Sequence, residues 1–147
     1  MKESYTLILN SLNATNRNII NGDTTIQYYV NWESVLPYIL DEKQKYNLSF
    51  SLRTVSNVGA LTESAFVEII MGQMHSNEQS GTSNIIGVIS PHNVHNSHYL
   101  LALPYDNMPV QIEYPSSSLV TINFLSLDKT TAFNMVDYVL ILTFEVI

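Results

Sequence analysis

The fold of this chain is decided by the stretch Tyr46-Asn47-Leu48-Ser49-Phe50-Ser51-Leu52-Arg53, in which every second side chain is apolar. Side chains of a strand point alternately to the two faces of a sheet, so this stretch predicts a strand with one buried and one wet face. The same alternation recurs at 108–114 and in further short runs that turn residues separate. Such a pattern is typical of a β-sandwich or jelly roll.

The whole sequence predicts one domain over residues 1–147, an antiparallel β-sandwich of about eight strands of the jelly-roll type. We expect strands at 5–9, 25–32, 46–54, 65–71, 85–89, 99–103, 108–114, 119–125 and 136–146. Polar stretches at 10–18, 72–84 and 92–98 are expected to be loops. Because Val139 and Ile141 make the last strand apolar on both faces, we expect it to be central in its sheet or covered by a partner.

The charge balance limits the kinds of partner. Six Lys and Arg against thirteen Asp and Glu give a net charge of -7, and the cations are scattered along the chain. An acidic surface repels a phosphate backbone, so no nucleic-acid partner is expected. No apolar stretch reaches the length of a membrane helix, and the chain has no cysteine for disulfides or thiolate metal sites. Charged residues make up only 13% of the chain, and a surface with few charges suits packing against neighbouring proteins.

Three histidines, His92, His95 and His98, are spaced three apart after Pro91. Three imidazoles can hold zinc or nickel if the backbone brings them together. The segment lies between two predicted strands and no carboxylate or cysteine accompanies it, so we favour a solvated loop over a metal site.

No catalytic constellation stands out. The carboxylates are dispersed over different predicted strands and turns, and neither a nucleophile elbow nor a phosphate-binding glycine loop is present. A pair of carboxylates that the fold brings close together, as in glycosidases, remains an alternative. We favour the simpler explanation that these carboxylates are the polar residues on the outer faces of a sheet. We therefore expect no enzyme activity and no cofactor.

Several stretches carry a resemblance to a known family. They are 5–17, Tyr29-Val30-Asn31-Trp32, Leu36-Pro37, 46–51 and 135–144. The first four are similar to the opening, and the last to the closing strand, of the single jelly-roll minor capsid proteins of nucleocytoplasmic large DNA viruses. The resemblance implies a non-enzymatic shell component that is repeated many times in the virion capsid and assembled in the host cytoplasm. Its implied partners are other capsid proteins and further copies of itself, as a trimer or pentamer.

Two other functions remain open. One is a trimeric receptor- or carbohydrate-binding head of the tumour-necrosis-factor or fibre-knob type, which shares the architecture. The other is a cupin-like metal enzyme that uses His92, His95 or His98, and it ranks last because cupin ligands face the inside of a barrel. The candidate interface positions are the 72–84 segment and the residues Trp32, Tyr38, His92, His95 and His98.

Overall fold

The protein is all-β, and every strand pairing in the part of the chain that the structure describes is antiparallel. A computed structural model describes residues 3–20, 23–36, 44–55, 64–71, 74–78, 81–94, 97–127 and 137–147. It describes the backbone alone at 16–20, 23–25, 74–78, 81–83, 93–94 and 97–98.

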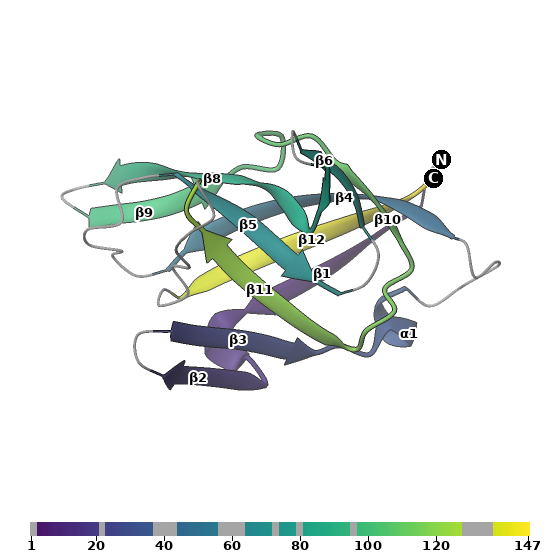
Figure 1. Ribbon diagram of the computed structural model, residues 1–147, viewed down its shortest axis with the longest axis horizontal. Coiled ribbons are helices and arrows are strands. Elements are labelled where there is room, and N and C mark those ends of the chain that lie inside the picture. Colours follow the sequence, from purple (N-terminus) through teal and green to yellow (C-terminus); the bar gives the residue numbers. More distant parts are fainter. Residues whose placement is uncertain are drawn as a thin grey trace.

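The strands are β1 (Ser4–Asn10), β2 (Asn16–Ile20), β3 (Asp23–Tyr29), β4 (Lys45–Thr54), β5 (Ala65–Ile70), β6 (Met74–Glu78), β7 (Gly81–Ser83), β8 (Ile85–Val94), β9 (Ser97–Ala102), β10 (Val110–Glu113), β11 (Leu119–Leu125) and β12 (Tyr138–Val146). Two short helices, η1 (Ser11–Asn13) and α1 (Trp32–Val35), complete the described elements (Figure 1).

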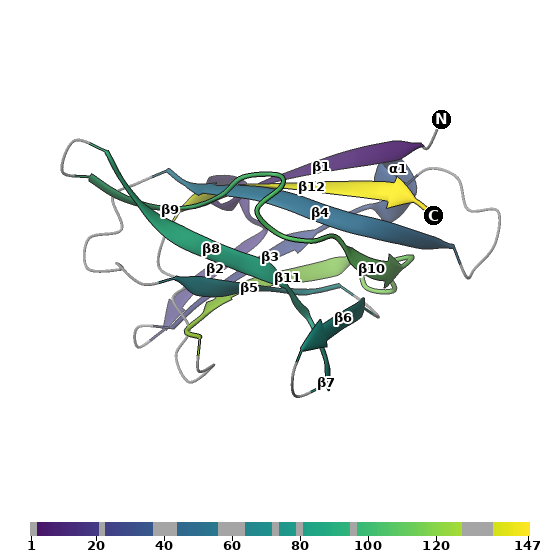
Figure 2. The ribbon, with the colours of Figure 1, turned by 90° about the horizontal axis from the view of Figure 1, so that it is seen from above.

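The strands form two layers, which Figure 2 shows edge-on. One layer has the order β1-β12-β4, and β4 continues to β10 through its first residues and to β9 through its last. The other has the order β2-β3-β11-β5-β8. The long strand β8 pairs with β5 first and then with β9, so it joins the layers on one side. The result is a barrel-like sandwich that is nearly closed.

Four of the strand pairings are nested along the chain. The first strand pairs with the last, β3 with β11, β4 with β9, and β5 with β8. The expected central position of the C-terminal strand is confirmed, because β12 lies between β1 and β4. The short strands β2, β6, β7 and β10 add to this eight-strand body within the described residues.

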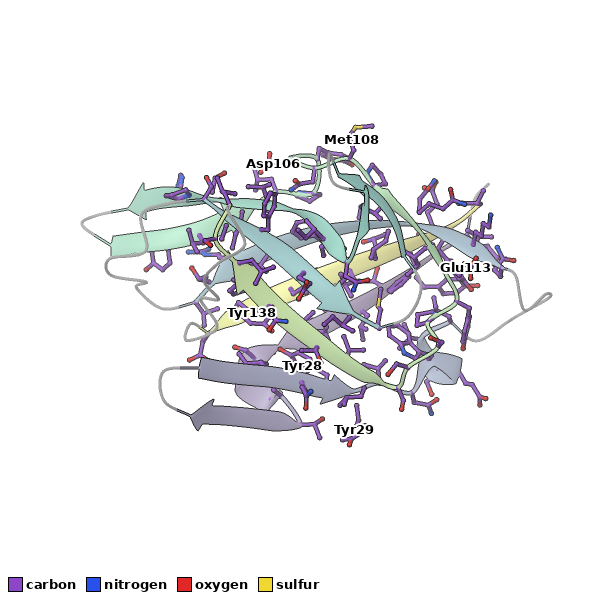
Figure 3. The ribbon with its side chains drawn as sticks, in the orientation of Figure 1. Tyr28, Tyr29, Asp106, Met108, Glu113 and Tyr138 are labelled. Atoms are coloured by element: carbon purple, nitrogen blue, oxygen red, sulfur yellow. The ribbon has the colours of Figure 1, made fainter. Side chains whose placement is uncertain are left out.

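The core lies between the layers and follows the predicted alternation. In β4 the side chains of Tyr46, Leu48, Phe50 and Leu52 are buried, as the sequence predicted. A hydroxyl contact crosses the core, since the Tyr28 hydroxyl of β3 donates to that of Tyr138 in β12 at 3.0 Å; Figure 3 labels both. Each fully buried large apolar side chain contributes roughly 1.5–3 kcal/mol to the stability of the fold, relative to the same side chain left exposed.

Several predicted loops are wrong. The 10–18 stretch contains η1 and the start of β2, and the 72–84 stretch contains β6 and β7. The predicted 92–98 loop belongs largely to strands, because β8 runs to Val94 and β9 begins at Ser97. Pro91 is tolerated there because, among the described strands, only β9 pairs with that half of β8, so no second ladder needs its missing donor.

Two predicted strands are shorter than expected. The strand predicted at 25–32 ends at Tyr29, and Trp32 begins α1. The strand predicted at 108–114 is reduced to β10, and Met108 is 85% exposed in the segment before it.

Candidate contact surface

The outer face of the β1-β12-β4-β9 layer carries apolar side chains beside polar ones. The register places Val139 of β12, Arg53 of β4 and Leu101 of β9 side by side. Their neighbours in the same strands, Leu140, Leu52 and Ala102, are buried, so the first three side chains share the outer face. In the adjoining row, Ile8 of β1 lies opposite Ile141 and is 62% exposed. This face therefore offers apolar surface to a neighbour.

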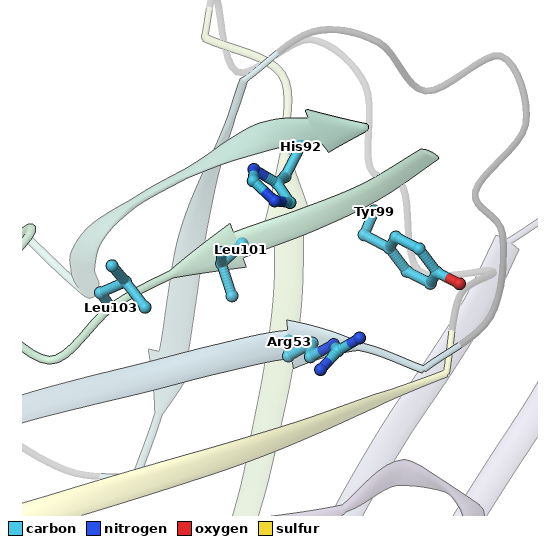
Figure 4. A pocket seen from close by; sticks show the side chains of 5 residues that line it. All are labelled: Arg53, His92, Tyr99, Leu101 and Leu103. Carbon is cyan, nitrogen blue, oxygen red and sulfur yellow. The ribbon is translucent and has the colours of Figure 1, made fainter. Parts of the chain in front are cut away.

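A hollow of about 320 Å³ lies at the β8–β9 end of this face. It is lined by Arg53, His92, Tyr99, Leu101 and Leu103, which Figure 4 shows from close by. His92 lies opposite Tyr99 in the register of β8 and β9. The Arg53 guanidinium carbon is 5.5 Å from the centre of the Tyr99 ring, a cation–π contact that orients both side chains.

Thr54 fixes β9 against β4 and so positions this hollow. Its buried hydroxyl accepts a hydrogen bond from the Leu100 amide at 3.0 Å and donates to the Leu100 carbonyl at 3.4 Å. These bonds continue the β4–β9 ladder beyond the pair of Arg53 and Leu101. A buried polar side chain with both functions satisfied is stabilising and holds a single arrangement.

Next to the hollow, the 103–108 segment displays large side chains on a fixed backbone. Tyr105 is 98% exposed and Met108 is 85% exposed. The Asp106 carboxylate accepts a hydrogen bond from the Leu103 amide at 2.7 Å, and the Asp106 amide donates to the Leu103 carbonyl at 3.1 Å. These two bonds close a tight turn beneath Tyr105.

Asn107 ties this segment to β8. Its side-chain amide donates to the Val88 carbonyl at 3.0 Å, and its side-chain oxygen accepts from the Val88 amide at 2.9 Å. Asn107 thus takes the place of a paired strand residue. A glycine makes room for it, since a β-carbon on Gly87 would lie 2.5 Å from Cγ of Asn107 and 2.7 Å from Cε1 of Phe50.

Exposed Tyr, Met and Arg side chains with little charge around them are the composition of protein–protein contact sites. We therefore define the contact surface as Arg53, His92, Tyr99, Leu101 and Leu103 of the hollow, together with Tyr105 and Met108.

Among the described side chains, His, Cys, Asp and Glu nowhere gather in a group of three or more that could bind a metal. Neither helix of the described part is long and apolar enough to cross a membrane.

The structure places the sequence-predicted positions in different environments. His92 lines the hollow, and Trp32 is buried, with 6% of its surface exposed. Trp32 therefore offers a partner little surface. His98 lies in β9 opposite Asn93, where only the backbone is described. Tyr38 and His95 lie outside the described residues.

Sequence reasoning named only His92 among the residues of the contact surface and missed Arg53, Tyr99, Leu101, Leu103, Tyr105 and Met108. A usable signal existed around Tyr105, because Pro104 and Asp106 are turn residues and the side chain between them is forced outward. The sequence predicted Met108 in a strand because it alternates with Val110. In the structure the hydrogen bonds between Asn107 and Val88 hold this segment before the strand begins.

Comparisons of the chain with protein-family models, with curated proteins and with solved structures found no match.

Proposed function

We propose that this protein is a structural subunit of a viral capsid, a minor capsid or penton-type protein that acts through protein–protein contacts in the shell. The observation that carries the proposal is the contact surface, in which a hydrogen-bonded turn displays Tyr105, and the segment after it displays Met108, beside an apolar hollow. The sequence resemblance to single jelly-roll minor capsid proteins points in the same direction.

The nested strand pairing supports the jelly-roll type. A jelly roll is a double sheet of eight strands built from two Greek keys. Pairing first with last, and so on inward, is what results when one long hairpin is rolled into two layers, and the pairs β1–β12, β3–β11, β4–β9 and β5–β8 follow that rule. Viral capsid domains are among the proteins that use this fold.

The energetics of the contact surface suit a shell subunit. Interface energy is concentrated in a few aromatic, Met and Arg side chains, and prior ordering of a segment lowers the entropy lost on binding. Burying one large apolar side chain contributes roughly 1.5–3 kcal/mol. Tyr105 and Met108 are exposed in the isolated chain, and the Asp106 and Asn107 hydrogen bonds already order their backbone.

The partners in this proposal are other capsid proteins and further copies of the chain, as a trimer or pentamer, in virions assembled in the host cytoplasm. Quantitative mass spectrometry of purified particles tests the proposal. We expect a fixed copy number per particle that is a multiple of three or five. Absence of the chain from purified particles contradicts the proposal, as does substrate turnover by the isolated protein.

A further inference from the structure

A second surface feature lies away from the contact surface. It is an open groove of about 720 Å³, lined by residues of the segments 29–33 and 114–118. In Figure 3, Tyr29 at this groove and Met108 at the contact surface lie on opposite sides of the molecule. The aromatic residues that line it are Tyr29, which is 63% exposed, the half-buried Tyr114, and the outer edge of Trp32.

The floor of the groove is rigid. The Trp32 indole donates to the Ser117 carbonyl at 2.8 Å, and the Val30 amide donates to the Ser118 carbonyl at 2.8 Å. Trp32 also packs edge-on against Phe144 of the core, with ring centres 5.7 Å apart. The two segments that line the groove are therefore held together before any ligand arrives.

Free polar groups surround the rings. Asn31, Glu33, Ser116 and Ser118 are exposed and line the groove, and among the described residues none of their side chains has a hydrogen-bond partner. The Tyr114 hydroxyl is buried and has no partner in the described part of the chain. Burial, together with the nearby Glu33 carboxylate, raises the pKa of Tyr114, so its hydroxyl stays protonated and able to donate.

We infer that this groove binds a neutral saccharide. A sugar ring has an apolar C–H face, which packs on aromatic side chains, and a rim of hydroxyl groups, which donate to carboxylates and accept from amides and hydroxyls. The groove supplies both kinds of partner, with Tyr29 and Tyr114 as the apolar surface and Glu33 and Asn31 as polar groups.

Charge limits the sugar class. Glu33 is acidic, no Lys or Arg lines the groove among the described residues, and the whole chain carries a net charge of -7. Sialic acids, uronic acids and sulfated sugars are therefore disfavoured relative to neutral saccharides. This inference does not depend on the proposed shell function, because a saccharide site is compatible with a shell protein and equally with a separate binding domain.

The chain contains a single tryptophan, Trp32, so its selectively excited fluorescence reports on this groove. We would titrate the full chain with lactose, chitotriose and maltotriose as neutral probes and with 3′-sialyllactose as the charged probe. At least one neutral probe is expected to change the emission saturably, with 3′-sialyllactose binding more weakly than lactose.

Variants locate the binding. Tyr29→Ala should raise the Kd about tenfold through loss of the stacked ring, whereas Tyr29→Phe should keep it within about twofold. Glu33→Gln should reduce the ratio of the Kd for 3′-sialyllactose to the Kd for lactose. The matched control is Tyr105→Ala, which removes an equally large exposed ring at the contact surface and should leave the Kd unchanged.

Three outcomes overturn the inference. They are no saturable response to any neutral probe, a Kd that Tyr29→Ala leaves unchanged, and tighter binding of 3′-sialyllactose than of lactose. If no saccharide binds but the chain is found in purified particles, only this inference fails. That result is distinct from absence of the chain from particles, which contradicts the proposed function.

Discussion

Replacing Gly87 with alanine tests whether Asn107 holds the contact segment to β8. The added β-carbon would lie 2.5 Å from Cγ and 2.6 Å from Oδ1 of Asn107, and 2.7 Å from Cε1 of Phe50. Overpacking of this kind costs roughly 1–3 kcal/mol. The lower entropy of the unfolded chain offsets about 0.4–1 kcal/mol of that cost. We expect Gly87→Ala to lower the free energy of unfolding by about 1–2 kcal/mol.

Asn107→Ala removes the other side of the same contact. It deletes two hydrogen bonds to Val88, each worth about 1 kcal/mol, so we expect a loss of about 2 kcal/mol. In the Asn107→Ala background, two of the three nearest atoms are gone and Cε1 of Phe50 remains, so Gly87→Ala should cost less than in the wild type. The double-mutant cycle should therefore give a coupling energy of at least about 0.5 kcal/mol.

Urea unfolding of the wild type, both single variants and the double variant measures this cycle. The midpoint should fall while the slope stays constant. A suitable control is Tyr105→Ala, in the same segment but without contact to β8. Additive losses within error, or a Gly87→Ala protein as stable as the wild type, would refute the reasoning.

Three further predictions concern the core and the surface. Tyr105→Ala should change the free energy of unfolding by less than about 0.5 kcal/mol, because the ring is 98% exposed; a larger loss in thermal melts would show that it supports the fold. Tyr28→Phe should cost about 1 kcal/mol in urea unfolding through loss of the 3.0 Å bond to Tyr138, and an unchanged midpoint would contradict this. Burial and the nearby Tyr114 raise the pKa of Tyr46 above its ordinary value near 10. A raised pKa means that the folded state holds the proton to a higher pH, so the contribution of Tyr46 to stability is constant below pH of about 10 and is lost above it. Tyr46→Phe should weaken that alkaline loss, and an identical profile of stability against pH would count against the assignment.

The sequence predicted the main strands because their burial follows a simple period. The alternation in β4 predicted which side chains are buried, and the doubly apolar β12 predicted a central strand. The same alternation failed at Met108, where the Asn107 side chain holds the backbone in place of a strand neighbour. A side chain that replaces a backbone hydrogen bond between strands leaves no periodic pattern in the sequence.

The candidate sites were harder to predict because they depend on pairing between distant residues. His92 reached the hollow only because β8 continues through Pro91 into the second layer, and a proline ordinarily argues against a strand. Arg53 and Tyr99 meet because β4 and β9 are neighbours, which sequence separation hides. Trp32 was expected to face a partner, but the turn into α1 brings it against Phe144.

Methionine oxidation, measured in the free protein and in purified particles, shows whether the contact surface is covered in a shell. Met108 is 85% exposed in the chain, whereas Met71 is 1% exposed and serves as the internal control. If the contact surface holds the subunit in a shell, Met108 oxidises readily in the free protein and is protected in particles, while Met71 resists in both. Equal oxidation of Met108 in both states would contradict the account.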